Sequence, residues 1–241
     1  MINMSTLLKK VLYRMNCCLQ TFINELRPMN GYLQILTRKA LNPEADSDSH
    51  FITCFSMVVT LRAKKILELG VWQGGTTLPF LCGATYTGGF VESVDINPTS
   101  FRCPRKLKPH WKFYQSDALK YLESIPEGFI YDLVYIDDWH AYEHVAKELE
   151  LLAPHVNKSS VILLHDLMHT FTHPNYVVYD DSNYYEVWGH EQNEGHKEQF
   201  ANGGPYRAVR ELDSNIWEFA TIPVCHGLTV LRKKSDIASR H

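Results

Sequence analysis

The chain has 241 residues, enough for one large α/β domain or two small ones, and we expect one main domain. Hydrophobic residues make up 45% and charged residues 21%, a composition that excludes a disordered or collagen-like chain. The net charge of −3 provides no positive field for a phosphate backbone, so we expect no nucleic-acid partner. Eight of the twelve histidines fall between residues 140 and 196, which makes this stretch a candidate site.

The cysteines and the N-terminal residues indicate a compartment. The six cysteines form no C-x-x-C pair, and we expect reduced thiols in a cytoplasmic protein. Polar residues interrupt every apolar run within residues 1–35, before a signal-peptide core or the roughly 20 residues of a membrane span is reached. We therefore expect no membrane partner.

The first 49 residues predict a helical extension. Apolar residues recur at spacings of three and four between residues 7 and 26, which predicts an amphipathic helix, and a second helical piece covers residues 32–41. We expect this extension to pack on the core or on a second subunit, which would give a homo-oligomer through the N-terminal helices. A lid or a membrane-surface role is the less favoured alternative.

Short apolar runs alternate with longer segments after residue 49. The runs predict five strands, at residues 65–69, 90–94, 111–114, 131–136 and 161–164. The segments between them are long enough for helices, such as residues 141–152, and two further runs at residues 215–222 and 227–232 predict an antiparallel hairpin. The fold class is therefore α/β, with a doubly wound, mostly parallel sheet over residues 50–241.

A glycine-rich turn follows the first predicted strand and opens a helix. The turn reads Glu68-Leu-Gly70-Val-Trp-Gln-Gly74-Gly75-Thr76-Thr77. Glycines let the backbone approach a ligand closely, and free N–H groups at a helix start receive an anion or a carboxylate. Tight turning alone is the alternative. Gly70 and Gly74 are four residues apart, unlike the glycines of the G-x-G-x-x-G motif in dinucleotide sites.

Acids follow the next two predicted strands, at the end of the sheet where doubly wound folds bind ligands. Asp95 can accept hydrogen bonds from two ribose hydroxyls, or it caps a helix over residues 98–103. Asp117 can accept a hydrogen bond from an exocyclic amine, or it caps the next helix. Together with Glu68, these acids predict a pocket for a nucleoside with a charged, amino-acid-like end.

These motifs resemble those of class I S-adenosylmethionine-dependent methyltransferases, over residues 50–232. Residues 131–143 (YDLVYIDDWHAYE) and 161–166 (VILLHD) are similar to a run found in metal-dependent small-molecule O-methyltransferases, of the caffeoyl-CoA and catechol type and of the macrocin-like type. The resemblance implies a Rossmann-like methyltransferase fold with S-adenosylmethionine as cofactor. The cofactor contacts it implies are Glu68, Gly70, Gly74, Thr76, Asp95, Asp117 and Asp137.

Two further acids end adjacent predicted strands. Strands in a sheet lie about 4.8 Å apart, so the carboxylates of Asp137 and Asp166 can reach one point, which suits a hard divalent cation. The resemblance implies that both bind a divalent metal, with Mg²⁺ expected, and that a third ligand lies beside Asp166. The family commonly has Glu before this Asp, whereas this chain has His165, whose imidazole shifts the preference toward Mn²⁺, Fe²⁺ or Zn²⁺.

Other histidines of the cluster receive different interpretations. The resemblance to the macrolide-sugar branch implies that His140 is a general base, with a cap-like hydrogen bond as the alternative. His144 lies one turn further along the same face and is expected at the surface. His165, His169 and His173 are four residues apart, but without a third spaced ligand we do not expect a zinc helix. Residues 167–205 are expected to form an aromatic substrate wall.

The sequence therefore predicts an enzyme that moves the methyl group of S-adenosylmethionine to a hydroxyl of a small molecule, with a divalent metal and with His140 as base. A noncatalytic nucleoside-binding or assembly protein on the same fold is one alternative, supported by the departure at His165. A nicotinamide-dependent oxidoreductase is another, and the absent G-x-G-x-x-G motif disfavours it.

Overall fold

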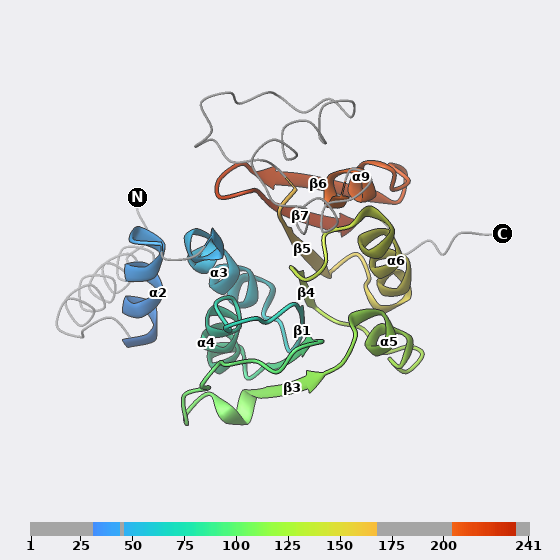
Figure 1. Ribbon diagram of the computed structural model, residues 1–241. Helices are drawn as coiled ribbons and strands as arrows, with labels where there is room; N and C mark the ends of the chain where they lie inside the picture. The colour runs from blue at the N-terminus through green and yellow to red at the C-terminus, as the bar shows by residue number, and fades with distance from the viewer. Residues whose placement is uncertain (1–30, 44–45, 168–203, 235–241) are drawn as a thin grey trace, which may run out of the picture.

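The computed structural model describes residues 31–43, 46–167 and 204–234 (Figure 1). Its helices are α2 (Gly31–Leu41), η1 (Asp46–His50), α3 (Phe51–Leu61), α4 (Thr77–Thr87), η2 (Lys108–His110), α5 (Ala118–Glu123), α6 (Tyr142–Leu152), η3 (Ala153–His155) and α9 (Gly204–Arg210). Its strands are β1 (Lys65–Leu69), β2 (Phe90–Asp95), β3 (Trp111–Gln115), β4 (Leu133–Ile136), β5 (Val161–His165), β6 (Trp217–Ile222) and β7 (Leu228–Lys233). Among the residues described, none of the helices is both long and apolar enough to cross a bilayer.

The strands form one seven-stranded sheet in the order β3-β2-β1-β4-β5-β7-β6. Strands β1 to β5 run parallel to one another, whereas β7 runs antiparallel to β5 and pairs with β6 as a hairpin. This arrangement confirms the predicted fold class. Because β1 lies between β2 and β4, the chain turns in opposite directions on its two sides, and such a switch point opens a crevice at the carboxyl ends of the strands.

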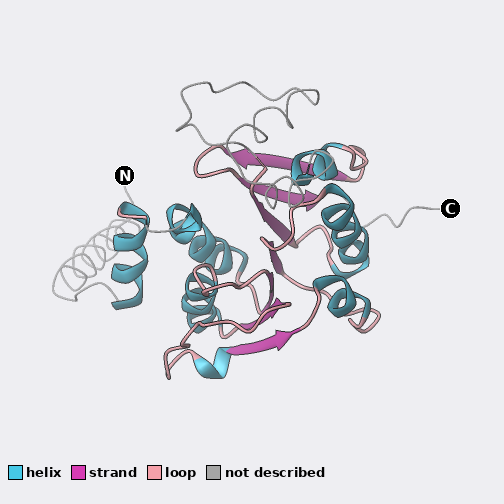
Figure 2. Cartoon of the chain, viewed as in Figure 1, coloured by secondary structure: helices cyan, strands magenta, loops and turns pink. Residues whose placement is uncertain are grey.

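Helices cover both faces of the sheet, which explains why the central strand β4 is apolar throughout. On one face lie α3 and α4, and on the other lie α5, α6 and α9 (Figure 2). Successive residues of β4 point to opposite faces, so Leu133 and Tyr135 join the core beneath α3 and α4, while Val134 and Ile136 join the core beneath α6. All four side chains are buried, as a parallel sheet between two helical layers requires.

The observed bounds differ from the predicted ones where local pairing ends. Strand β4 begins at Leu133, two residues later than predicted, although the Tyr131 amide still donates to the His155 carbonyl at 2.9 Å. Residues 98–103 contain no helix, so the helix that Asp95 was expected to cap is absent.

Part of the N-terminal extension is described. Helix α2 confirms the second helical piece, and its Leu36 is fully buried in the same core as Phe51 of α3. The polar linker contains the short helix η1. The amphipathic helix expected over residues 7–26, the oligomer contact expected there, and residues 168–203 of the expected substrate wall lie outside the described residues.

Candidate active site

A cavity of about 640 Å³ opens at the carboxyl ends of β1, β2, β4 and β5. Its wall includes the start of the glycine-rich turn and the acids that follow the strands. The lining residues include Gly70, Val71, Trp72, Asp95, Asn97, Asp117, Asp137, Asp138, Trp139, His140, His144, His165 and Asp166. The predicted site residues Glu68, Gly74 and Thr76 do not line the cavity.

The glycine-rich turn requires glycine at two positions. Gly70 has a φ of +85°, and a Cβ atom there would lie 2.1 Å from the Asp137 carbonyl oxygen. Gly74 has a φ of +75°, and its Cβ would lie 2.3 Å from Cγ of Phe101. Only glycine allows both the left-handed backbone and this close approach. Gly70 thus brings the end of β1 against the residue that follows β4, and Gly74 serves the packing of the turn.

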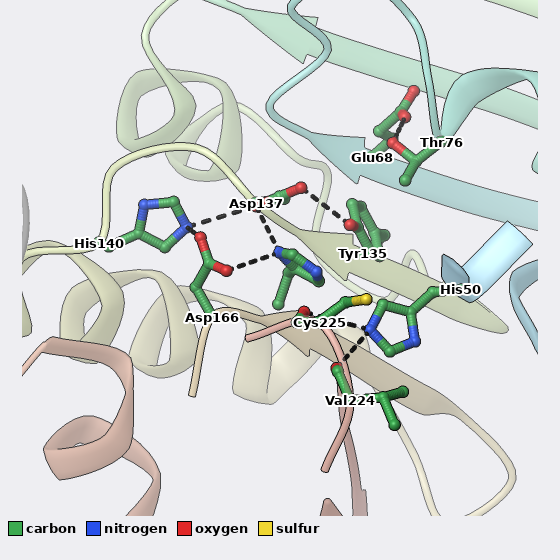
Figure 3. Close-up of polar contacts among 10 residues, drawn as sticks. His50, Glu68, Thr76, Tyr135, Asp137, His140, Asp166, Val224 and Cys225 are labelled. Atoms are coloured by element: carbon green, nitrogen blue, oxygen red, sulfur yellow. Dashed lines mark hydrogen bonds and ion pairs between the residues drawn. The ribbon is translucent and has the colours of Figure 1, made fainter. Parts of the chain in front are cut away.

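Glu68 supports this turn from inside the core. Its carboxylate is fully buried and accepts hydrogen bonds from the hydroxyls of Thr76 and Thr77, both at 2.8 Å, and of Ser93 at 2.6 Å. Burial raises the pKa of Glu68 to about 7, against the lowering effect of these three donors. Glu68 and Thr76 therefore hold the turn to β1 and β2 (Figure 3), and their direct contact with a cofactor stays a prediction.

Asp95 ties the same turn to the end of β2. Its Oδ2 accepts hydrogen bonds from the Val71 and Trp72 amides, both at 2.9 Å, and its Oδ1 accepts one from the Asn97 amide at 2.8 Å. A carboxylate has about four acceptor positions, so these three bonds leave room for a ligand hydroxyl. The helix-cap alternative for Asp95 is wrong, because residues 98–103 form no helix for it to cap.

Asp117 begins α5 and also lines the cavity. Its Oδ1 accepts a hydrogen bond from the Lys120 amide at 3.0 Å, as an N-cap side chain does. The capping role that the sequence left open is therefore present. The capping bond uses only Oδ1, and a contact between the carboxylate and a ligand amine stays a prediction.

At the other end of the cavity, acids and histidines meet (Figure 3). His140 Nε2 lies 3.3 Å from Asp137 Oδ1 and 3.2 Å from Asp166 Oδ2. Each of these three residues offers a metal-ligand atom, and the three atoms lie within 4.8 Å of one another. His165 Nδ1 lies 2.9 Å from Asp166 Oδ1 and 3.5 Å from Asp137 Oδ1, but His165 is not part of this group. The structure thus adds His140 to the candidate metal-ligand set, and the expected role of His165 as third ligand stays a prediction.

Opposite charges set the ionisation of this centre. Burial opposes ionisation of Asp137 and Asp166, but His165 and His140 outweigh it and lower the pKa of both carboxyls. The same carboxylates outweigh burial at His140 and His165 and raise the pKa of each imidazole. In addition, the Tyr135 hydroxyl donates to Asp137 Oδ2 at 2.8 Å. Asp166 has a φ of +63°, a strained conformation that is typical of functional sites.

His50 supports this centre from behind, and the sequence did not identify it. Its Nε2 lies 3.0 Å from the Val224 carbonyl oxygen, and its ring packs edge-on against His165 at 5.3 Å between centroids. The contact joins residues 174 positions apart, so no local pattern predicts it. His165 is buried, and its Nε2 has no hydrogen-bond partner among the described residues.

A second group of acidic and histidine side chains, near the first, was not predicted from the sequence. Asp138 Oδ2 lies 3.1 Å from His144 Nε2, which in turn lies 3.6 Å from Glu148 Oε1. His144 was expected at the surface, but only 17% of its side chain is exposed and it lines the cavity. The signal available in the sequence was the spacing of four between His144 and Glu148, which places both on one helix face.

Comparisons with known proteins agree with this geometry. Residues 67–167 match a family model described as a methyltransferase domain. No curated protein sequence matches the chain. A structure assigned to a caffeoyl-CoA O-methyltransferase of Staphylococcus aureus is 12% identical, with a TM-score of 0.59 over 91% of this chain and 99% of that chain.

Two other solved structures carry bound ligands. The O-methyltransferase of Bacillus cereus, in complex with S-adenosylhomocysteine, is 15% identical, with a TM-score of 0.54 over 89% of this chain and 96% of that chain. The MycE methyltransferase of the mycinamycin biosynthetic pathway, in complex with Mg, S-adenosylhomocysteine and mycinamycin VI, is 17% identical, with a TM-score of 0.56 over 88% of this chain and 57% of that chain. The match over residues 67–167 and the shared fold confirm the resemblance of this chain to class I S-adenosylmethionine-dependent methyltransferases.

Proposed function

We propose that this protein transfers the methyl group of S-adenosylmethionine to a hydroxyl group of a small molecule. The observation that carries the proposal is the cavity itself, because its wall holds both the Gly70 turn with Asp95 and the group formed by Asp137, His140 and Asp166. A nucleoside-binding end and a proton-handling end thus face the same space. Methyl transfer needs the donor and the hydroxyl side by side, and proximity of this kind supplies much of the rate.

The charges of the cavity suit the cofactor. S-adenosylmethionine carries a sulfonium and an ammonium group, and five acids line the cavity: Asp95, Asp117, Asp137, Asp138 and Asp166. The same carboxylates repel phosphate groups, which favours a small acceptor over a nucleic acid. Asp95 would accept a hydrogen bond from one ribose hydroxyl at its remaining acceptor position, and the exposed side chain of Ile96 would lie against the base.

The donor set at the other end fits a divalent cation. Asp137 and Asp166 would hold the cation, which supplies Lewis-acid chemistry that lowers the pKa of the acceptor hydroxyl. Two imidazoles are candidates for the third ligand, because His140 Nε2 and His165 Nδ1 each lie within 3.5 Å of both carboxylates. One imidazole among two carboxylates accepts Mn²⁺, Fe²⁺ or Zn²⁺ as well as the expected Mg²⁺.

His140 would take the proton from the hydroxyl. Its Nε2 faces the same point as Asp137 Oδ1 and Asp166 Oδ2, so a hydroxyl that enters there meets all three. The two carboxylates raise the pKa of His140 and so favour its protonated form, which cannot act as a base. A cation bound between the carboxylates would lower the pKa of His140 again and free its imidazole to accept a proton. Base catalysis by His140 and occupation of the carboxylate pair are therefore linked.

Calorimetric titration with S-adenosylmethionine and S-adenosylhomocysteine tests the cofactor assignment, and no heat of binding at millimolar ligand overturns the proposal. Transfer of a labelled methyl group to a panel of hydroxyl compounds tests the reaction. Binding without transfer to any of them would favour the noncatalytic alternative. The His140→Gln variant then separates two roles: a base loses turnover and keeps cation affinity, whereas a ligand loses both.

A further inference from the structure

A second group of possible metal ligands lies beside the proposed catalytic centre. Asp138 follows Asp137 at the end of β4, and His144 and Glu148 lie one turn apart on the same face of α6. Their ligand atoms, one from each residue, lie within 4.8 Å of one another. No atom of this group is shared with the group formed by Asp137, His140 and Asp166.

The buried carboxyl group of Glu148 makes this second group energetically unusual. The side chain is fully buried, among core residues such as Val145 and Leu149 of the same helix. Its Oε2 has no hydrogen-bond partner among the described residues, and neither has Asp138 Oδ1. Burial of a carboxylate is costly unless a donor or a cation compensates it, so this arrangement is incomplete as described.

The spacing of the atoms fits a bound ion. His144 Nε2 lies 3.1 Å from Asp138 Oδ2 and 3.6 Å from Glu148 Oε1. Ligands at about 2.1 Å from a tetrahedral zinc ion lie about 3.4 Å from one another, which falls between these two distances. Two separations among the ligand atoms therefore fit an ion of this size, and the third, between the carboxylates of Asp138 and Glu148, is at most 4.8 Å.

A proton on His144 explains the arrangement less completely. The Nε2–H group makes one strong hydrogen bond, and Asp138 Oδ2 at 3.1 Å is its nearer acceptor. Glu148 is then left without a close donor, and it must either stay ionised in the core or take up a proton itself. A divalent cation compensates both carboxylates at once.

We propose that Asp138, His144 and Glu148 form a second divalent-cation site, of the imidazole–carboxylate class that suits Zn²⁺. Asp138 and His144 line the cavity and Glu148 lies behind them, so a bound ion faces the cavity on its open side. That side accepts a water molecule or an oxygen atom of a ligand in the cavity. The site stands independently of the proposed methyl transfer, because its residues and its atoms are different.

Zinc binding to the full-length chain without an affinity tag tests the site. Equilibrium dialysis with Zn²⁺ alone should show that His144→Asn and Glu148→Gln each bind one equivalent fewer than the wild type. Glu150→Gln is the matched control on the same helix, since Glu150 is exposed and paired with Lys147, and it should bind as many equivalents as the wild type. Zinc bound elsewhere in the chain cancels in these differences.

Equal stoichiometry in the wild type and in both variants would overturn the proposal. Anomalous diffraction at the zinc edge from wild-type crystals soaked in Zn²⁺ gives an answer that does not depend on how the variants fold. A peak between His144 Nε2 and Glu148 Oε1 supports the site. A peak confined to the pair Asp137 and Asp166, or no peak at all, contradicts it. Loss of the peak at Asp166 in an Asp166→Asn variant, with the second peak retained, would show that the two sites are separate.

Discussion

The two ends of the cavity are built from different chemical groups. At the nucleoside end, the Asp95 carboxylate is held by the backbone amides of Val71, Trp72 and Asn97. At the other end, Asp137 and Asp166 meet the side chains of two histidines. Backbone amides are fixed by the fold, whereas the protonation of the two imidazoles depends on the carboxylates that they face. The first end is therefore complete without a ligand, and the second depends on protons or cations.

The largest effect is expected at the nucleoside end, where the backbone itself forms the wall. In Gly70→Ala, the new Cβ meets the Asp137 carbonyl oxygen at 2.1 Å on a residue with a φ of +85°. We expect about 4 kcal/mol loss of unfolding free energy and loss of measurable cofactor binding, because the turn must move. Urea unfolding and calorimetry measure both. Gly75→Ala is the control in the same turn, since its Cβ makes only ordinary contact, 3.4 Å from Ser47 Oγ at the nearest; a similar loss there would refute the reason given for Gly70.

The corresponding change at the other end should leave the cofactor in place. Asp166→Asn removes the charge that would hold a cation and should lower methyl transfer by about 1,000-fold, or about 4 kcal/mol in the barrier. Affinity for S-adenosylhomocysteine should change little, because the nucleoside end is unaltered. A chelator should slow the wild type and not the variant. If the cofactor affinity falls as far as the rate, the two ends are not independent.

The support beneath the nucleoside end should respond to pH. Burial raises the pKa of Glu68 from 4.5 to about 7, so between these values the unfolded chain releases a proton that the folded chain keeps. Stability from this group is therefore present at low pH and is lost as the pH rises through the window. Relative to the wild type, Glu68→Gln should gain about 3 kcal/mol across it. Urea unfolding at pH values below and above the window measures this gain, and a difference that does not vary with pH contradicts it.

The smallest effect is expected at the cap of α5. Asp117→Ala removes the acceptor of the Lys120 amide and should cost about 1 kcal/mol, whereas Asp117→Asn, itself a good cap, should cost little. Thermal unfolding of both variants measures the difference. Measuring cofactor affinity sharpens the comparison. If the Asp117 carboxylate also binds a ligand amine, both variants bind the cofactor more weakly than the wild type. If Asp117 only caps the helix, neither variant does.

The order and type of the described core elements were predictable from the sequence. Strands with both faces covered are mostly apolar, and short runs of this kind predicted β1 at its observed bounds and β5 within one residue. The predicted bounds were wrong where backbone pairing, and not residue composition, decides where a strand begins. Tyr131 is as apolar as the strand that follows, but its amide bonds to His155 outside the sheet.

The side chains of the site were predictable only in part. Acids after strands pointed to the correct edge of the sheet, because that position follows from topology. That His140 and His165 both contact the same two carboxylates was not predictable, because the path of the turns after β4 and β5 decides where each imidazole lies. The burial of Glu148 was hidden as well, because one carboxylate on a helix looks the same in sequence whether it faces water or the core.

The C-terminal hairpin has a consequence for the order in which the protein is made. The Asp166 amide donates to the Gly227 carbonyl at 3.1 Å, and His165 pairs with Leu228 of β7. On the ribosome, β5 is therefore an unprotected apolar edge strand until β7 emerges, and Asp166 lacks this anchor until then. A nascent chain that ends before β7 already holds every strand of the nucleoside end. The cation centre is thus the last part to be completed, and incomplete chains should bind the cofactor before they gain metal-dependent activity.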